Sequence, residues 1–160
     1  MGAITSRYLA TFLLSILSLS FLLNAGCITE RTISTEPAPV ETLYIQVSLL
    51  VHVNENDVRW FRDVEVPHGT NGYELTEIVT EGNLESTYYP AFFSHFVESL
   101  FGIANQNPHF WLTYLWNEGQ QQWEPLPVGA DLFSLKNGHV LAWSYTDTSQ
   151  QPSRPHSVTP

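Results

Sequence analysis

The chain has 160 residues, with 6 Lys and Arg against 16 Asp and Glu, which gives a formal net charge of −10. This acidic balance argues against a nucleic-acid partner, because a phosphate backbone has to be neutralised by basic side chains. Aromatic residues make up 13% of the chain and charged residues 14%, which is too aromatic and too sparsely charged for a disordered protein. The single cysteine excludes an intramolecular disulfide and any metal site built from several cysteines.

Residues 1–26 have the features of an export signal, because Arg7 precedes a run, residues 8–25, that contains no charged side chain. The run ends in Ala25-Gly26-Cys27, which resembles the lipobox of prokaryotic lipoproteins. That resemblance implies that Cys27 is the lipidation site and the new N-terminus. The alternative is that the run remains as a transmembrane anchor. Both interpretations predict an exported protein held at the outer face of the cytoplasmic membrane or in the cell envelope.

Composition divides the rest of the chain into three parts. Residues 27–42 contain the candidate lipidated cysteine and a stretch rich in Thr, Ser, Glu and Pro, which predicts a flexible tether. Residues 148–160 form a polar, proline-rich segment that predicts a disordered tail. The folded domain is therefore expected over residues 43–147.

A β-hairpin is predicted at the start of this domain. Apolar and polar residues alternate over residues 43–53, and the turn residues Asn-Glu-Asn-Asp follow. Residues 58–66 are rich in β-formers and are expected to return antiparallel. Strict alternation places Trp60 on one face with three valines and Phe61 on the other; the valines are Val58, Val64 and Val66.

One helix of about ten residues is expected next. Asn71 and Glu74 have the spacing of a capping box, and Gly82 marks the C-terminal end. The apolar face of this helix is expected to contain Leu75, Ile78 and Val79.

The remaining segments predict a sheet. Residues 83–90 are expected to form a loop, and residues 92–101 fit the period of a strand and of a helix equally well. Residues 109–116 predict a central strand, residues 123–126 an edge strand limited by prolines, and residues 140–145 a closing strand. This order predicts an α+β fold of β-grasp-like type, with a mixed sheet of four to six strands and one main helix.

The C-terminal half also resembles a known family. The aromatic strand at 110–117, the turns at 128–131 and 136–138, and the aromatic strand at 140–145 occur in the same order in an uncharacterised prokaryotic domain family. That family is related to the C-terminal β-grasp domain of transcobalamin and intrinsic factor, and the resemblance covers residues 47–145. In the transcobalamin relatives this domain covers one face of a bound cobalamin. The resemblance therefore implies a β-grasp fold and cobalamin as a candidate ligand.

Aromatic residues give the candidate binding site. Trp116 and Trp123 flank a turn, and with Tyr114 and Asn117 they form the tentative ligand-binding set, since flat aromatic surfaces stack on small molecules. Trp111 and Trp143 are expected in the core.

Catalytic and metal-binding patterns are not found. The six histidines lack metal-ligand spacing, and no nucleophile elbow, phosphate loop or dinucleotide fingerprint occurs. The sequence therefore predicts no catalytic residues, no metal site and a binding protein rather than an enzyme. The expected partners are a membrane and either a small molecule or another envelope protein, and a protein-interaction module is the first alternative. A carboxylate-based hydrolase, drawing on Glu98, Glu118 and Glu124, is the second alternative.

Overall fold

The computed structural model describes residues 42–149 and 158–160. The predicted signal or anchor, the lipidation site Cys27 and almost all of the predicted tether lie outside these residues, as do residues 150–157 of the predicted tail. In the described part of the chain, no helix has the length and apolar character needed to cross a membrane.

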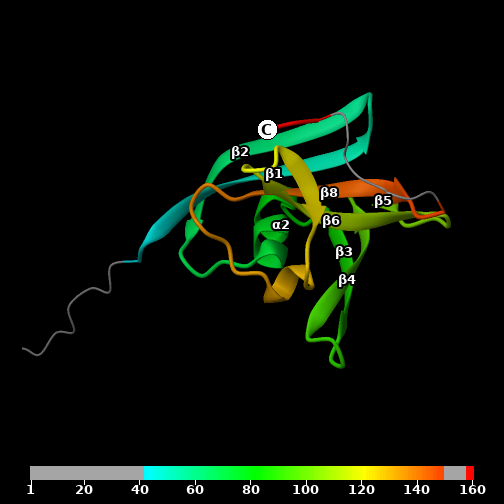
Figure 1. Cartoon of the computed structure of the whole chain (residues 1–160). Helices are drawn as coiled ribbons and strands as arrows, with labels where there is room; N and C mark the ends of the chain where they lie inside the picture. The colour runs from blue at the N-terminus through cyan, green and yellow to red at the C-terminus, as the bar shows by residue number, and fades with distance from the viewer. Residues whose placement is uncertain (1–41, 150–157) are drawn as a thin grey trace, which may run out of the picture. The chain divides into compact units, whose positions relative to one another are not determined.

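Five strands form one mixed sheet in the order β2-β1-β8-β6-β7 (Figure 1). The strands are β1 (Tyr44–Asn54), β2 (Asp57–Pro67), β6 (His109–Asn117), β7 (Gln122–Pro125) and β8 (Val140–Asp147). β1 and β8 are parallel neighbours at the centre, while the other pairs are antiparallel. The predicted α+β fold, with a mixed sheet and one main helix, is confirmed.

Helix α2 (Gly72–Thr80) begins at the predicted capping box. The Asn71 side chain accepts a hydrogen bond from the Glu74 amide, and the Glu74 carboxylate accepts one from the Asn71 amide, both at 2.9 Å. The chain leaves the helix through Glu81, whose φ of 49° is left-handed, and then through Gly82. Both ends of the helix therefore follow from local sequence.

The buried face of α2 differs from the predicted one, since it lacks Ile78 and includes Tyr73, Thr76 and Thr80. Ile78 is 48% exposed, whereas Thr76 is completely buried. The Thr76 hydroxyl donates to the Gly72 carbonyl oxygen and accepts a hydrogen bond of 2.8 Å from the indole N–H of Trp143. A hydroxyl group can be buried without penalty when it both donates and accepts a hydrogen bond. The hydrophobic pattern of the sequence counts threonine as polar, so it does not predict that Thr76 is buried.

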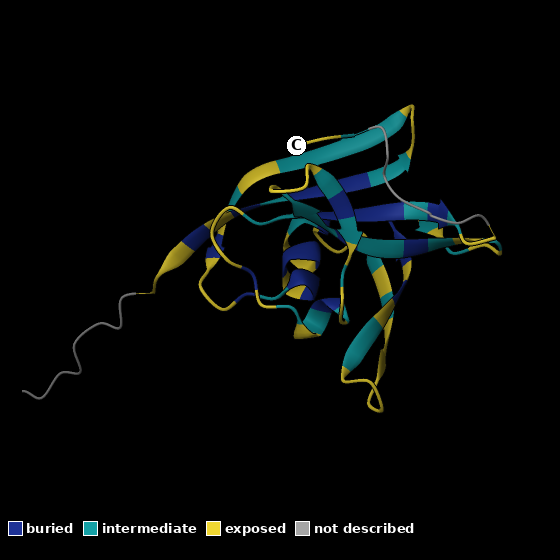
Figure 2. Cartoon of the chain, viewed as in Figure 1, coloured by how far each residue is buried: buried dark blue, intermediate teal, exposed yellow. Residues whose placement is uncertain are grey.

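The sheet buries side chains on both faces, in two separate clusters. Figure 2 colours much of the central strands β1 and β8 as buried. The face toward α2 forms the larger cluster, in which Trp111 and Trp143 are 3% and 5% exposed, and this confirms their predicted core positions. The opposite face forms a second cluster around Leu50, Tyr114, Trp123 and Ala142. Val158, in the C-terminal segment, packs against this second cluster.

The predicted alternation along β2 is wrong in its second half. Val58 and Trp60 lie on the second face, whereas Phe61, Val64 and Val66 pack toward the α2 side. The cause is a register shift between β1 and β2 near Asp63, which takes a left-handed φ of 52°. A bulge adds one residue to the strand and moves all later side chains to the other face.

A second sheet lies where a loop and an ambiguous segment were expected. It contains β3 (Leu84–Tyr89), β4 (Ser94–Leu100) and the short β5 (Ile103–Ala104), in the order β3-β4-β5. The prediction of a loop over residues 83–90 is therefore wrong, since β3 pairs with β4 along its whole length. The Trp111 indole donates to the Ile103 carbonyl oxygen at 2.8 Å and joins β6 to this sheet. The β3–β4 hairpin projects from the rest of the domain (Figure 1).

The bond between Thr76 and Trp143 should stabilise the packing of α2 on the sheet. Replacing Thr76 by Val keeps the side-chain shape but leaves the buried indole N–H without a partner. We expect the free energy of unfolding to fall by about 1–3 kcal/mol in urea denaturation. As a control, Thr42→Val at the exposed position before β1 should change it by less than about 0.5 kcal/mol. Equal effects of the two substitutions would contradict this assignment.

Candidate functional site

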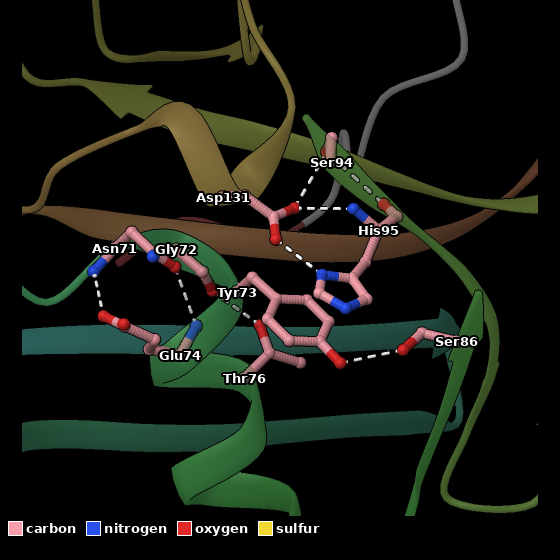
Figure 3. A network of polar contacts seen from close by, with 9 residues as sticks. All are labelled: Asn71, Gly72, Tyr73, Glu74, Thr76, Ser86, Ser94, His95 and Asp131. Atoms are coloured by element: carbon pink, nitrogen blue, oxygen red, sulfur yellow. Dashed lines mark hydrogen bonds and ion pairs between the residues drawn. The ribbon is translucent and has the colours of Figure 1, made fainter. Parts of the chain in front are cut away.

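The carboxylate of Asp131 connects the β3–β4 hairpin to the loop that precedes β8 (Figure 3). Asp131 lies in the short helix η1 (Ala130–Leu132). Its Oδ2 atom accepts hydrogen bonds of 2.8 Å from the Ser94 hydroxyl and from the His95 amide, and its Oδ1 atom lies 2.6 Å from His95 Nδ1. Gly129 permits this close approach, because a Cβ atom there would collide with the Ser94 hydroxyl oxygen.

The imidazole of His95 is held from two directions. Asp131 binds Nδ1, and the ring stacks on Tyr73 with centroids 4.0 Å apart and planes 7° from parallel. The Tyr73 hydroxyl is in turn hydrogen-bonded to the Ser86 hydroxyl at 2.8 Å, which links α2 to β3. Tyr88 also contacts the imidazole, with ring centroids 5.0 Å apart and planes tilted by 53°. The ring is therefore fixed in plane and in direction.

Two pKa shifts reflect this arrangement. Burial would raise the pKa of the Asp131 carboxyl, but the hydrogen bonds from His95 and Ser94 outweigh it and hold the pKa below the ordinary 3.8. Burial raises the pKa of the Tyr73 hydroxyl, which keeps this phenol neutral. The Asp131 carboxyl is therefore ionised near neutral pH, and its Oδ1 atom can accept a hydrogen bond from His95 Nδ1.

Next to His95, the end of the hairpin exposes five aromatic side chains. This aromatic tip consists of Tyr88, Tyr89, Phe92, Phe93 and Phe96. The pairing of β3 with β4 places Tyr88 on the same face of the hairpin as His95, and Tyr89 and Phe96 on the opposite face. Phe92 and Phe93 are 71% and 68% exposed. Residues 86–97 contain no Asp, Glu, Lys or Arg. A concentration of exposed aromatic side chains without charge is typical of a surface that binds another molecule.

The four residues of the predicted ligand-binding set lie elsewhere, at the β6–β7 end of the sheet. Tyr114 and Trp123 are only 2% and 4% exposed, and Trp116 is half-buried with its ring edge-on to Trp123. The Asn117 side chain donates to Glu124 and accepts from the Gln120 amide, which stabilises the turn. The Trp123 indole donates to the Val158 carbonyl oxygen. In this structure these groups pack and hold a turn, and a ligand-binding role for them remains a prediction.

Sequence reasoning missed His95, Asp131 and the aromatic tip. His95 and Asp131 are 36 residues apart and meet only after the hairpin has formed. The aromatic tip had a signal, namely the uncharged stretch at residues 86–97. The hairpin was not predicted, because residues 83–90 were expected to form a loop and residues 92–101 fitted a strand and a helix equally well. Within the described residues, no group of three or more His, Cys, Asp or Glu side chains is arranged to hold a metal ion.

Comparison with solved structures identifies the fold. Haptocorrin in complex with Cbi matches with a TM-score of 0.55 and 18% identity, over 67% of this chain and 26% of the haptocorrin chain. The chain thus spans about a quarter of that protein. A Ruminococcus gnavus ATCC 29149 protein to which metal binding is ascribed matches with a TM-score of 0.48 and 12% identity, over 64% of this chain and 97% of that chain. No family model and no curated protein matches the sequence. The haptocorrin likeness supports the relation to the transcobalamin-type fold that the sequence resemblance implied.

The pKa of Asp131 gives the domain a specific pH dependence. Because the folded-state pKa lies below 3.8, the bonds to His95 and Ser94 stabilise the fold above pH 3.8 and are lost as the pH falls through the folded pKa. We expect the wild-type protein to be more stable than Asp131→Asn at about pH 6, and this difference to shrink toward about pH 3. Urea denaturation at both pH values measures it. A difference that is constant with pH would contradict the assigned role of the carboxylate.

Proposed function

We propose that the domain is a non-catalytic binding domain for a small ligand of the corrinoid class, and that the ligand binds at the aromatic tip. The observation that carries the proposal is the exposure of five uncharged aromatic side chains at the end of the hairpin that also holds the fixed imidazole, with Tyr88 in contact with that ring. Such a surface suits a flat ligand with an apolar face. The fold likeness to haptocorrin supports the corrinoid class.

The solvent exposure of the aromatic tip favours one further candidate function. Phe92 and Phe93 project into solvent, and exposed aromatic side chains are also typical of protein-protein contacts. A module that binds another envelope protein is therefore the second candidate. The two candidates differ in whether the isolated protein binds a corrinoid at all.

Tryptophan fluorescence tests the corrinoid proposal. The full-length protein in mild detergent is titrated with cobinamide and with cobalamin, with correction for light absorbed by the ligand. We expect saturable quenching, because corrinoids absorb in the region where the five tryptophans emit. If no quenching beyond this correction occurs at high micromolar ligand, the corrinoid proposal is wrong.

Substitutions locate the binding surface. The double variant Phe92→Ser, Phe93→Ser should weaken binding about tenfold or more, since each aromatic contact contributes about 0.5–1.5 kcal/mol beyond its buried area. The control Tyr44→Ser removes an exposed aromatic side chain at the start of β1 and should leave the affinity unchanged. If Trp116→Ala abolishes binding while the double variant binds normally, the ligand instead occupies the site predicted from sequence.

We propose in addition that Cys27 carries the lipid anchor that holds the exported domain at the membrane. The proposal rests on the sequence Ala25-Gly26-Cys27 after the apolar run. With radiolabelled palmitate, Cys27→Ser should lose the label and its detergent partitioning. If the parent protein partitions into detergent without any label, the run is an uncleaved anchor instead.

A further inference from the structure

The second ring nitrogen of His95 is available for a ligand. The Asp131 carboxylate accepts hydrogen bonds from the Ser94 hydroxyl and the His95 amide, and its Oδ1 atom lies 2.6 Å from His95 Nδ1, so the proton of this last hydrogen bond is assigned to Nδ1. In the neutral imidazole, the lone pair then lies on Nε2. Among the residues that the structure describes, no partner is hydrogen-bonded to Nε2, and Figure 3 shows this atom directed away from Asp131.

An imidazole bonded to a carboxylate through one nitrogen is the arrangement that protein metal sites use. The carboxylate fixes the tautomer and the ring direction, and it raises the basicity of the other nitrogen. His95 has this bond to a carboxylate through Nδ1, and the Tyr73 ring stacked on its face restrains the imidazole further. The side chain is 28% exposed, so the second nitrogen lies within reach of solvent.

Among the described residues, the surroundings of His95 supply too few ligands to hold a bare metal ion. Protein sites for divalent ions use three or four ligands, and in the described part of the chain no such group is present. A metal held by a planar macrocycle already has its equatorial ligands and needs only an axial donor. Tyr88, on the same face of the hairpin as His95, and the turn residues Phe92 and Phe93 offer exposed rings to the apolar face of such a macrocycle.

We propose that Nε2 of His95 coordinates the cobalt ion of the bound corrinoid, with Asp131 as the positioning residue. This inference rests on the proposed function and adds the atom that binds the metal. With aquacobinamide, the Nε2 lone pair forms a bond to Co(III) and one axial water leaves. The oxidation state does not change, and the proton stays on Nδ1.

A purely structural role is the competing explanation for the His95–Asp131 pair, because it also fastens the hairpin to η1. A spectroscopic readout separates the two roles. Nitrogen coordination changes the visible absorption of aquacobinamide, whereas stacking on aromatic side chains leaves the axial ligands in place. Dicyanocobinamide, whose axial positions are both occupied, should bind without that change.

Matched variants assign the change to His95. We expect His95→Gln to bind aquacobinamide without the spectral change, and His68→Gln, at an exposed histidine outside the site, to behave as wild type. Asp131→Asn keeps an acceptor for His95 but loses the anion, and should weaken coordination by about 10–100-fold. Unfolding curves of each variant show whether the fold is retained.

The native protein supplies a test that needs no variant. Chemical reduction of the bound cobinamide to Co(II) gives a species whose electron paramagnetic resonance lines are split by an axial nitrogen. Natural-abundance protein should show a triplet, and protein labelled with ¹⁵N-histidine a doublet. We expect the triplet to become a doublet on labelling, and we expect the nitrogen splitting to be absent in His95→Gln.

The outcomes are distinguishable from those of the proposed function. Fluorescence quenching without a spectral change or nitrogen splitting would overturn coordination by His95 and leave corrinoid binding intact. A nitrogen signal that persists in His95→Gln would also overturn it. Absence of any quenching would overturn the proposed function and this inference with it.

Discussion

The three hydrogen bonds to the Asp131 carboxylate determine how the domain presents its candidate site. They join η1, a short helix in the loop before β8, to the first two residues of β4. The β3–β4 hairpin belongs to a separate sheet, so its direction depends on contacts of this kind. Because the acceptor is an anion, these hydrogen bonds are stronger than those between neutral groups. One carboxylate therefore aims the aromatic tip and also fixes the tautomer of His95.

The two kinds of aromatic side chain in this domain have different roles. Trp111 and Trp143 fill the core beneath α2, and Trp123 packs on the opposite face of the sheet. The indole N–H groups of all three have carbonyl or hydroxyl acceptors, as buried polar groups require. Phenylalanine and tyrosine supply the exposed surface of the hairpin instead. Aromatic content alone does not distinguish these roles, because it is equally compatible with a core and with a binding surface.

The sequence allowed prediction of the features that depend on near neighbours. The alternation of β1, the capping box at Asn71 and Glu74 and the core positions of Trp111 and Trp143 all follow from local pattern. The bulge at Asp63 did not, since it arises from the register between two strands. The candidate site could not be predicted either, because His95 and Asp131 are distant in sequence and meet only in the tertiary structure. The hairpin that carries His95 was missed as well, because residues 84–100 lack a clear hydrophobic period.

The haptocorrin likeness shows the fold, and the local chemistry carries the proposal. The likeness concerns the fold, while the fixed imidazole and the aromatic tip are properties of this chain. The most direct test of the account is the position of cobalt in crystals of the protein grown with cobinamide. Anomalous diffraction at the cobalt absorption edge should give a peak beside Nε2 of His95. A peak at the Trp116–Asn117 turn, or no bound cobalt in crystals soaked to saturation, would contradict it.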